Sequence, residues 1–463
     1  MNTGILKKLA VSGLLLTMFL CFAGMADAQS KKDQKKAKQL VEEAEKAFRQ
    51  KNYRSAIDNY AESIVLVPNN ANAHFWKGYA HYYLKEYDQA LPEMDTALKL
   101  GYTPLDVYKV RWFLNFDKKN YDAALADIQE GLKLEPNNLM FLVGLAEISY
   151  SKGQYPESLA AYQKASSMQP ANADIWYNIA RVEGALGDSK AQSDAAERAI
   201  KGNTRFLGDS YLMLGDSYYH QRRFDEAIDA YNRALAAKPD TFEAYRNLAD
   251  IYRNQNKFDD AIQISKKALL VFPNDGRIYA DLSWYYGLAD RSQDAIDAAQ
   301  AAITFRPKDA IGYTNLCRAY NDTKQYQMAI NSCNKALQLS PDDGETNYYL
   351  GRAYDLLNKR SEANKYYDHA VTGLEQFTKD NPDYSDGFYL LGNALFADNQ
   401  IDKAIAAYQQ CLNLSPRFTR ARYNLGIMQI QKKNKSAAVE QYNALLSLDA
   451  DLAAKLKTEI DNL

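Results

Sequence analysis

Histidines and cysteines carry the broadest chemistry of any residues in this sequence, which contains four of each. His74 and His81 are spaced to lie on one face of a helix, as two metal ligands would, but no third ligand is spaced to join them. We therefore expect both to be core histidines, while His220 and His369 are isolated. The sequence predicts no metal site.

The sequence also lacks the short motifs that hold phosphates, metals or nucleophiles. It contains no Walker loop, HExxH, GxGxxG, GxSxG or CxxC pattern. One sequence pattern, repeated in tandem, accounts for residues 35–450 and leaves no separate catalytic domain. We expect no catalytic residues and no cofactor, so the protein is predicted not to be an enzyme.

The repeat is visible as a ladder of small residues. The ladder runs through Ala44, Gly78, Ala146, Ala180, Gly215, Ala249, Ser283, Cys317, Gly351, Gly392 and Gly426, with Trp112 in the one remaining slot. The step is 34 residues, except for 35 before Gly215 and 41 before Gly392. Further ladders of small residues follow twelve and nineteen residues behind the first, and prolines close most units.

This spacing predicts two antiparallel helices per repeat, each about 14 residues and ~21 Å long. Small residues mark the points where the two backbones come closest, since a larger side chain there would overpack the contact. We therefore expect Trp112 to distort its own repeat. The segment from Tyr211 to Tyr218, followed by Ala227, Tyr231, Ala234 and Pro239, closely resembles a tetratricopeptide repeat.

The resemblance covers roughly residues 35–450 and implies an all-α fold, a right-handed superhelical solenoid of about twelve helix pairs. It also implies a concave groove lined by the first helix of each pair. Residues 451–463 resemble the capping helix that covers the last apolar face of such an array. The 41-residue step predicts that the second helix of the long repeat, around residues 344–384, runs on past Val371 for about two turns and protrudes.

Two sets of residues are candidates for the groove. The family contacts peptides through an asparagine two residues before the small one, which is matched by Asn178, Asn247, Asn315 and Asn424 but interrupted at Met213, Tyr349 and Leu390. The second set is an aromatic series at steps of 34 residues, comprising Phe48, Tyr82, Phe116 and Tyr150, with Phe75, Tyr79 and Phe113 close to it. These rings either contact a partner or wedge against neighbouring helices, and the sequence favours neither interpretation.

Cys317 and Cys333 fall on the two facing helices of repeat nine, equally far from the turn. An oxidising compartment would permit a disulfide between them. Packed helix axes are ~8–10 Å apart, however, which is near or beyond disulfide reach. The sequence leaves the bond open, and this helix spacing favours free thiols.

Residues 1–28 read as a secretory signal peptide, with Lys7 and Lys8 before an apolar run and Ala26-Asp27-Ala28 as the cleavage site. Residues 29–34 would then form a polar tether. No later stretch approaches the ~20 apolar residues of a membrane span. The formal net charge of −2 gives no indication of nucleic-acid binding.

The sequence therefore predicts an exported, periplasmic or otherwise extracytoplasmic adaptor that binds a peptide or protein segment, with repeats one to four as its primary face. Two alternatives remain. One is a structural component that self-associates through its convex face or its ends, and the other is a chaperone-like or glycan-binding helper. The junction at residues 201–208 lacks a proline and carries one added residue, so we expect a weak interface there.

Overall fold

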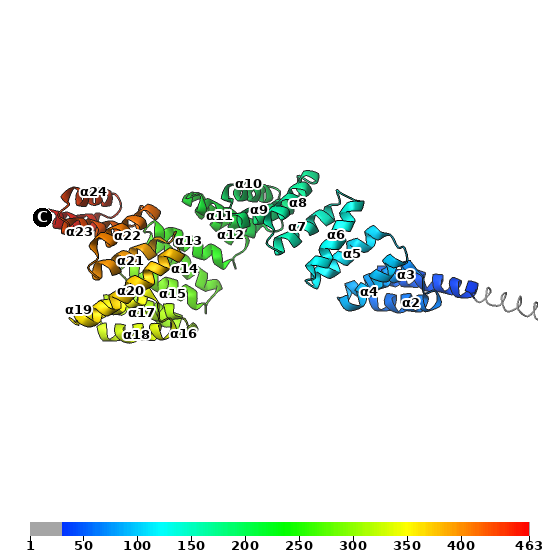
Figure 1. Cartoon of the computed structure of the whole chain (residues 1–463), viewed down its shortest axis with the longest axis horizontal. Coiled ribbons are helices and arrows are strands. Elements are labelled where there is room, and N and C mark those ends of the chain that lie inside the picture. Colours follow the sequence, from blue (N-terminus) through cyan, green and yellow to red (C-terminus); the bar gives the residue numbers. More distant parts are fainter. Residues whose placement is uncertain (1–29, 463) are drawn as a thin grey trace, which may run out of the picture. The chain divides into compact units, whose positions relative to one another are not determined.

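A computed structural model describes residues 30–462, and every regular element in that range is an α-helix (Figure 1). The predicted signal peptide, residues 1–28, lies outside the described residues. The predicted tether is helical from residue 30 onward, as part of a helical stretch over residues 30–49. Among the described residues, no helix is both long enough and apolar enough to span a membrane.

The chain divides into two compact units between Arg205 and Phe206, which is within the junction predicted to be weak. Unit 1 continues after residues 30–49 with α2 (Tyr53–Leu66), α3 (Ala71–Tyr83), α4 (Tyr87–Lys99), α5 (Pro104–Asp117), α6 (Tyr121–Leu134), α7 (Leu139–Ser151), α8 (Tyr155–Met168), α9 (Ala173–Leu186) and α10 (Ser189–Lys201).

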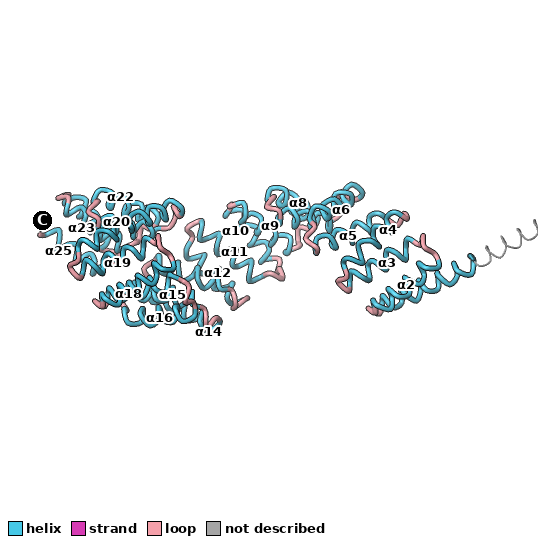
Figure 2. Tube along the Cα trace, turned by 60° about the horizontal axis from the view of Figure 1, so that its bottom comes forward, coloured by secondary structure: helices cyan, strands magenta, loops and turns pink. Residues whose placement is uncertain are grey.

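Unit 2 repeats the same alternation of first and second helices (Figure 2). It comprises α11 (Leu207–His220), α12 (Phe224–Ala237), α13 (Phe242–Asn254), α14 (Phe258–Val271), α15 (Gly276–Leu288), α16 (Ser292–Phe305), α17 (Ala310–Asp322), α18 (Tyr326–Leu339), α19 (Gly344–Leu356), α20 (Arg360–Asp380), α21 (Ser385–Ala397), α22 (Ile401–Leu414), α23 (Thr419–Gln431), α24 (Lys435–Leu445) and α25 (Ala450–Asp461). The all-α solenoid fold and the helix pairs are as predicted.

The two helices of a pair meet where a small residue on the first receives a side chain from the second. A Cβ atom added at Gly215 would lie 2.6 Å from the Tyr231 ring, and one added at Gly392 would lie 2.6 Å from the Tyr408 ring. Both tyrosine rings are buried. The small-residue ladder therefore marks the closest approach of the helices, as expected.

The turn between the two helices of each pair contains a residue in the left-handed backbone region. This residue lies two positions before the second helix begins. Most of these residues are not glycine, although the left-handed region is unfavourable for other residue types. They are Lys51, Lys85, Lys119, Gly153, Gly187, Arg222, Asn256, Asp290, Lys324, Asn358, Asn399 and Lys433. One residue of this kind lets the chain reverse in a short turn and pack the second helix antiparallel to the first.

Cys317 and Cys333 form a disulfide with a Cα–Cα distance of 5.3 Å, so the spacing argument for free thiols was wrong. Cys317 occupies a position of the small-residue ladder. Cys333 occupies the position at which other repeats have a tyrosine packed against the small residue, such as Tyr231 against Gly215. Average axis spacing does not apply at this point, because these two positions are where the helices come closest.

The expected distortion at Trp112 is absent from its own helix, since α5 is continuous from Pro104 to Asp117. The indole is buried, with 5% of the residue exposed. Room for it comes from the next repeat, where a Cβ atom at Gly144 would lie 2.9 Å from the ring. The large residue is accommodated by a glycine on the neighbouring helix.

The second helix of the long repeat, α20, has 21 residues and ends at Asp380, shortly before Pro382. Its added turns do not protrude freely. Phe377 packs against Gly387 and Tyr384 at the start of α21, and Thr378 is buried. The segment predicted to cap the array contains α25, whose Leu456 side chain packs against Gly426.

We expect the disulfide to contribute about 3 kcal/mol to the stability of unit 2, as an ordinary cross-link closing a loop of this length does. The Cys317→Ser/Cys333→Ser variant should therefore unfold at lower denaturant concentration than the parent. Thiol titration of the denatured, non-reduced mature chain should find only Cys411 free. Three titratable thiols would contradict the bond.

We also expect the boundary between the units to open more often than the interior of unit 2. Amide hydrogen exchange over residues 201–208 should be faster than in α13 and α14, because no proline closes the junction and the two compact units separate there. Equal protection of the two regions would contradict a weak junction.

Candidate functional site

A cavity of about 1090 Å³ lies within unit 2, and most of its wall belongs to the first helices of successive pairs. These are α13, α15, α17, α19, α21 and α23, the helices that the repeat resemblance places along the concave side. The second helix α20 also contributes, through residues of its added turns such as Phe377 and Asp380. The long repeat thus supplies part of the cavity wall.

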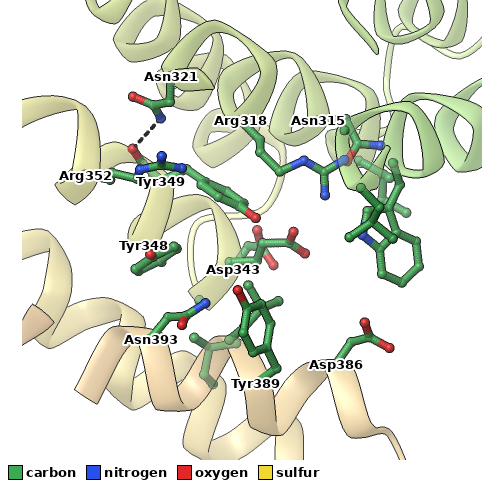
Figure 3. Close-up of a pocket in the computed structure, with 18 of the residues that line it drawn as sticks. Asn315, Arg318, Asn321, Asp343, Tyr348, Tyr349, Arg352, Asp386, Tyr389 and Asn393 are labelled. Carbon is green, nitrogen blue, oxygen red and sulfur yellow. Dashed lines mark hydrogen bonds between the residues drawn. The ribbon is translucent and has the colours of Figure 1, made fainter. Parts of the chain in front are cut away.

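Aromatic and amide side chains form much of the lining. In Figure 3, Tyr389 and Asn393 from α21 face Tyr348 and Arg318 from α19 and α17 across the open space. The aromatic residues of the lining are Trp284, Tyr326, Tyr348, Tyr349, Phe377, Tyr384, Tyr389 and Phe418. The asparagines are Asn315, Asn321, Asn393 and Asn424. Such a surface offers flat apolar faces next to hydrogen-bonding groups, as binding sites commonly do.

Acidic residues outnumber basic ones in the lining. The acidic residues are Asp281, Asp290, Asp322, Asp342, Asp343, Glu345, Asp380 and Asp386, and the basic ones are Arg246, Arg318, Lys324, Arg352 and Arg420. Several of them pair with one another or with a neighbour. Arg352 bonds Asp322 at 3.1 Å and Arg420 bonds Asp290 at 3.3 Å.

Two of these carboxyl groups have a pKa well above the ordinary value for their residue type. Burial, with a further contribution from Asp250, raises the pKa of Asp281 to about 7. Burial also raises the pKa of Glu345 to about 7, although the nearby Arg318 opposes the shift. The cause is desolvation in both cases, because a buried carboxylate without a bonded cation is costly to ionise.

The Arg318 guanidinium is buried against the cavity, with 8% of the residue exposed. It lies over Gly287, where an added Cβ atom would be 3.4 Å from Nε. Its Nη2 atom is buried and has no hydrogen-bond partner among the described residues, and the same holds for Asn321 Oδ1. Unsatisfied buried polar atoms are rare in folded proteins, so the Arg318 side chain, which lines the cavity, marks a place where a ligand could bond.

Contacts between distant repeats close unit 2 around the cavity. Arg253 of α13 and Asp386 of α21 form an ion pair in which both side chains are 7% exposed. Asn256 Nδ2 donates to the Arg417 carbonyl oxygen at 2.7 Å, and Arg420 Nη2 donates to the Leu288 carbonyl oxygen at 2.9 Å. The sequence analysis missed these contacts, because they join residues more than 130 positions apart and occur once each.

Most of the predicted asparagines form hydrogen bonds with the neighbouring repeat. Asn247 Nδ2 donates to Asp216 Oδ1, Asn315 Nδ2 to the Ala280 carbonyl oxygen, and Asn424 Nδ2 to Asn393 Oδ1, each at 2.9 Å. Asn178 Oδ1 accepts from Arg181. Only Asn315 and Asn424 of this series line the cavity.

The predicted aromatic series belongs to unit 1, none of its residues lines this cavity, and each ring contacts the first ring of the following helix. The centroid distances are 5.2 Å for Phe48–Tyr53, 6.4 Å for Tyr82–Tyr87, 5.7 Å for Phe116–Tyr121 and 5.4 Å for Tyr150–Tyr155. All four rings of the series remain partly exposed. These rings therefore pack between the two helices of a pair and are still partly accessible to solvent.

Of the rings predicted to accompany the series, Phe75 is a core residue, 5% exposed and stacked on Tyr102 at 4.3 Å. Tyr79 contacts Phe48 at 5.7 Å and Tyr82 at 6.0 Å, and Phe113 stacks on Trp112 at 3.7 Å. Tyr79 and Phe113 are partly exposed.

Both candidate histidines are buried and bonded to single carboxylates. His74 Nδ1 bonds Glu93 and His81 Nδ1 bonds Glu86 at 2.7 Å. Residues 30–462 contain no cluster of three or more histidine, cysteine or acidic side chains placed to hold a metal ion.

Comparison with known proteins finds the same repeat along the chain. Models of the tetratricopeptide repeat match residues 41–101, 116–166, 212–276, 310–343 and 419–452, and a TPR repeat model matches residues 146–187 and 392–433. The yeast (Saccharomyces cerevisiae) small glutamine-rich tetratricopeptide repeat-containing protein 2 is 38% identical over 74 residues. That match covers 16% of this chain and 20% of the relative's length.

Solved structures with similar helix arrays include the MamA protein, which is 29% identical with a TM-score of 0.33 over 38% of this chain and 95% of its own. Yeast Tom70 is 16% identical with a TM-score of 0.38, covering 92% and 95% of the two chains. A tetratricopeptide repeat protein from Parabacteroides merdae is 13% identical with a TM-score of 0.45, covering 56% and 98%. On the repeat models and the helix pairs, the chain belongs to the tetratricopeptide repeat family.

Proposed function

We propose that this protein is a non-catalytic scaffold of the cell envelope that holds an extended segment of a partner protein in the cavity of unit 2. Tetratricopeptide repeats support a role in protein interaction. The observation that carries the cavity assignment is the Arg318 side chain in its wall, which is buried and whose Nη2 has no hydrogen-bond partner among the described residues.

The size and chemistry of the cavity suit a peptide. Its volume of about 1090 Å³ is slightly above the ~300–1,000 Å³ range of small-molecule sites. An extended peptide supplies both carbonyl and N–H groups at regular spacing, so it can bond arginine and asparagine side chains together. The aromatic faces would take its side chains.

An extracytoplasmic location has two independent supports. Residues 1–28 have the pattern of a signal peptide. The Cys317–Cys333 disulfide would persist in an oxidising compartment and would be unusual in a reducing one.

Site-specific photo-crosslinking tests which face holds the partner. A photoreactive amino acid at Tyr389, in the cavity wall, should give one defined protein adduct in envelope extract, identified by mass spectrometry. The matched probe at Tyr82 samples the aromatic series of unit 1. An adduct at Tyr82 with none at Tyr389 would move the binding face to repeats one to four and contradict the cavity assignment.

We expect Arg253→Ala to destabilise unit 2 by about 3–5 kcal/mol, because it leaves Asp386 buried without its partner. Burial opposes the charge of Arg253, but Asp386 and Asp250 overcome this and raise its pKa. Replacing both partners, in Arg253→Met/Asp386→Leu, should recover most of the loss, since no uncompensated charge then remains.

Denaturant unfolding measures these differences. Lys432→Ala is the matched control, because the Lys432–Asp402 pair is exposed and should contribute less than about 1 kcal/mol. If Arg253→Ala costs no more than this control, the buried pair does not hold unit 2 closed.

A further inference from the structure

The cavity wall contains two half-buried carboxylates that have no hydrogen-bond or ion-pair partner among the described residues. Asp281 on α15 and Glu345 on α19 line the cavity, and neither side-chain carboxylate forms a hydrogen bond or an ion pair with any described residue. Other acidic groups of the lining, such as Asp322 and Asp290, are paired with arginines. Asp342 and Asp380 are exposed, and Asp343 accepts hydrogen bonds from Thr346. Asp281 and Glu345 are therefore the half-buried carboxylates of the lining that have no bonded partner.

The charged groups around each carboxyl do not remove this excess. Asp343 and Asp386 add negative potential at Glu345, and Arg318 alone opposes them. Asp250 and Asp275 do the same at Asp281, against Arg246 and Arg253. Arg253 is already shared between Asp250 and Asp386.

Arg318 provides an independent indication of a ligand. Its buried Nη2 is a donor without an acceptor, and Figure 3 shows its side chain among the groups around the open space. A backbone carbonyl oxygen would satisfy this donor without adding negative charge beside Glu345. Unpaired carboxylates together with an unpaired donor fit a ligand that carries both cations and neutral acceptors.

We propose that the segment held in the cavity is basic: lysine or arginine side chains of the partner lie against Glu345 and Asp281, while a backbone carbonyl oxygen accepts from Arg318 Nη2. Trp284 and Tyr389 in the same wall offer aromatic faces to the aliphatic stems and cationic heads of such side chains. This inference rests on the proposed function, since it specifies the chemistry of the segment.

The test uses the full mature chain and three fluorescent peptide pools of equal length at about 0.15 M salt. Lysine or arginine alternates with mixed uncharged residues in the basic pool, glutamate replaces the basic residues in the acidic pool, and glutamine replaces them in the neutral pool. Fluorescence anisotropy should show the basic pool binding about tenfold or more tightly than the neutral pool, which corresponds to one or two desolvated ion pairs.

The Glu345→Gln/Asp281→Asn variant should lose this preference, whereas Asp402→Asn, which removes an exposed carboxylate outside the cavity, should keep it. We do not expect the Glu345→Gln/Asp281→Asn variant to be less stable than the parent protein. The raised pKa values mean that ionised Asp281 and Glu345 destabilise the folded state at neutral pH, so removing their charge relieves that cost.

A pH series adds a readout that general attraction to an acidic protein would not give. Cations bind the ionised carboxylates, so affinity for the basic pool should rise between about pH 5.5 and pH 8 as Asp281 and Glu345 lose their protons, and binding should release protons. In the Glu345→Gln/Asp281→Asn variant this rise should be absent.

The outcomes separate this inference from the proposed function. Equal binding of all pools, preference for the acidic pool, or a basic preference that survives Glu345→Gln/Asp281→Asn would overturn the basic segment. The proposed function would still stand if the Tyr389 crosslink is obtained. Loss of both that crosslink and the basic preference would overturn both.

Discussion

The close contact between the two helices of each pair is the constraint on which the rest of the structure depends. A small residue on the first helix allows a side chain of the second, often a tyrosine, to lie directly on its backbone, as Tyr231 does on Gly215. Because this contact recurs along the chain, the first helices share one orientation within a unit and together line one surface. The cavity of unit 2 is built on that surface.

Features that repeat could be predicted from the sequence. The spacing of the small residues predicts the helix pairs, and the 41-residue step predicts the extra turns of α20. Both follow from local periodicity, which sequence records directly. The helix α25 was expected from the resemblance to the repeat family. The disulfide was misjudged because an average distance between helix axes was applied at the point of closest approach.

The candidate site could not be predicted in the same way. Arg253 and Asp386 are far apart in sequence, and neither belongs to a ladder of equivalent residues. Arg318 and Glu345 are ordinary charged residues on helices until unit 2 is closed around them. The burial of Arg318 and the place of Glu345 in the cavity wall depend on tertiary structure. Of the asparagine series, only Asn315 and Asn424 line the cavity.

The contacts that close unit 2 also change how it can unfold. In an open solenoid each repeat touches only its neighbours, so the ends fray and unfolding spreads inward one repeat at a time. In unit 2, α13 and α15 are tied to α21 and α23. Fraying from the C-terminal end must therefore break long-range bonds before it reaches the middle repeats, which makes repeats seven to twelve a single cooperative block that resists stretching.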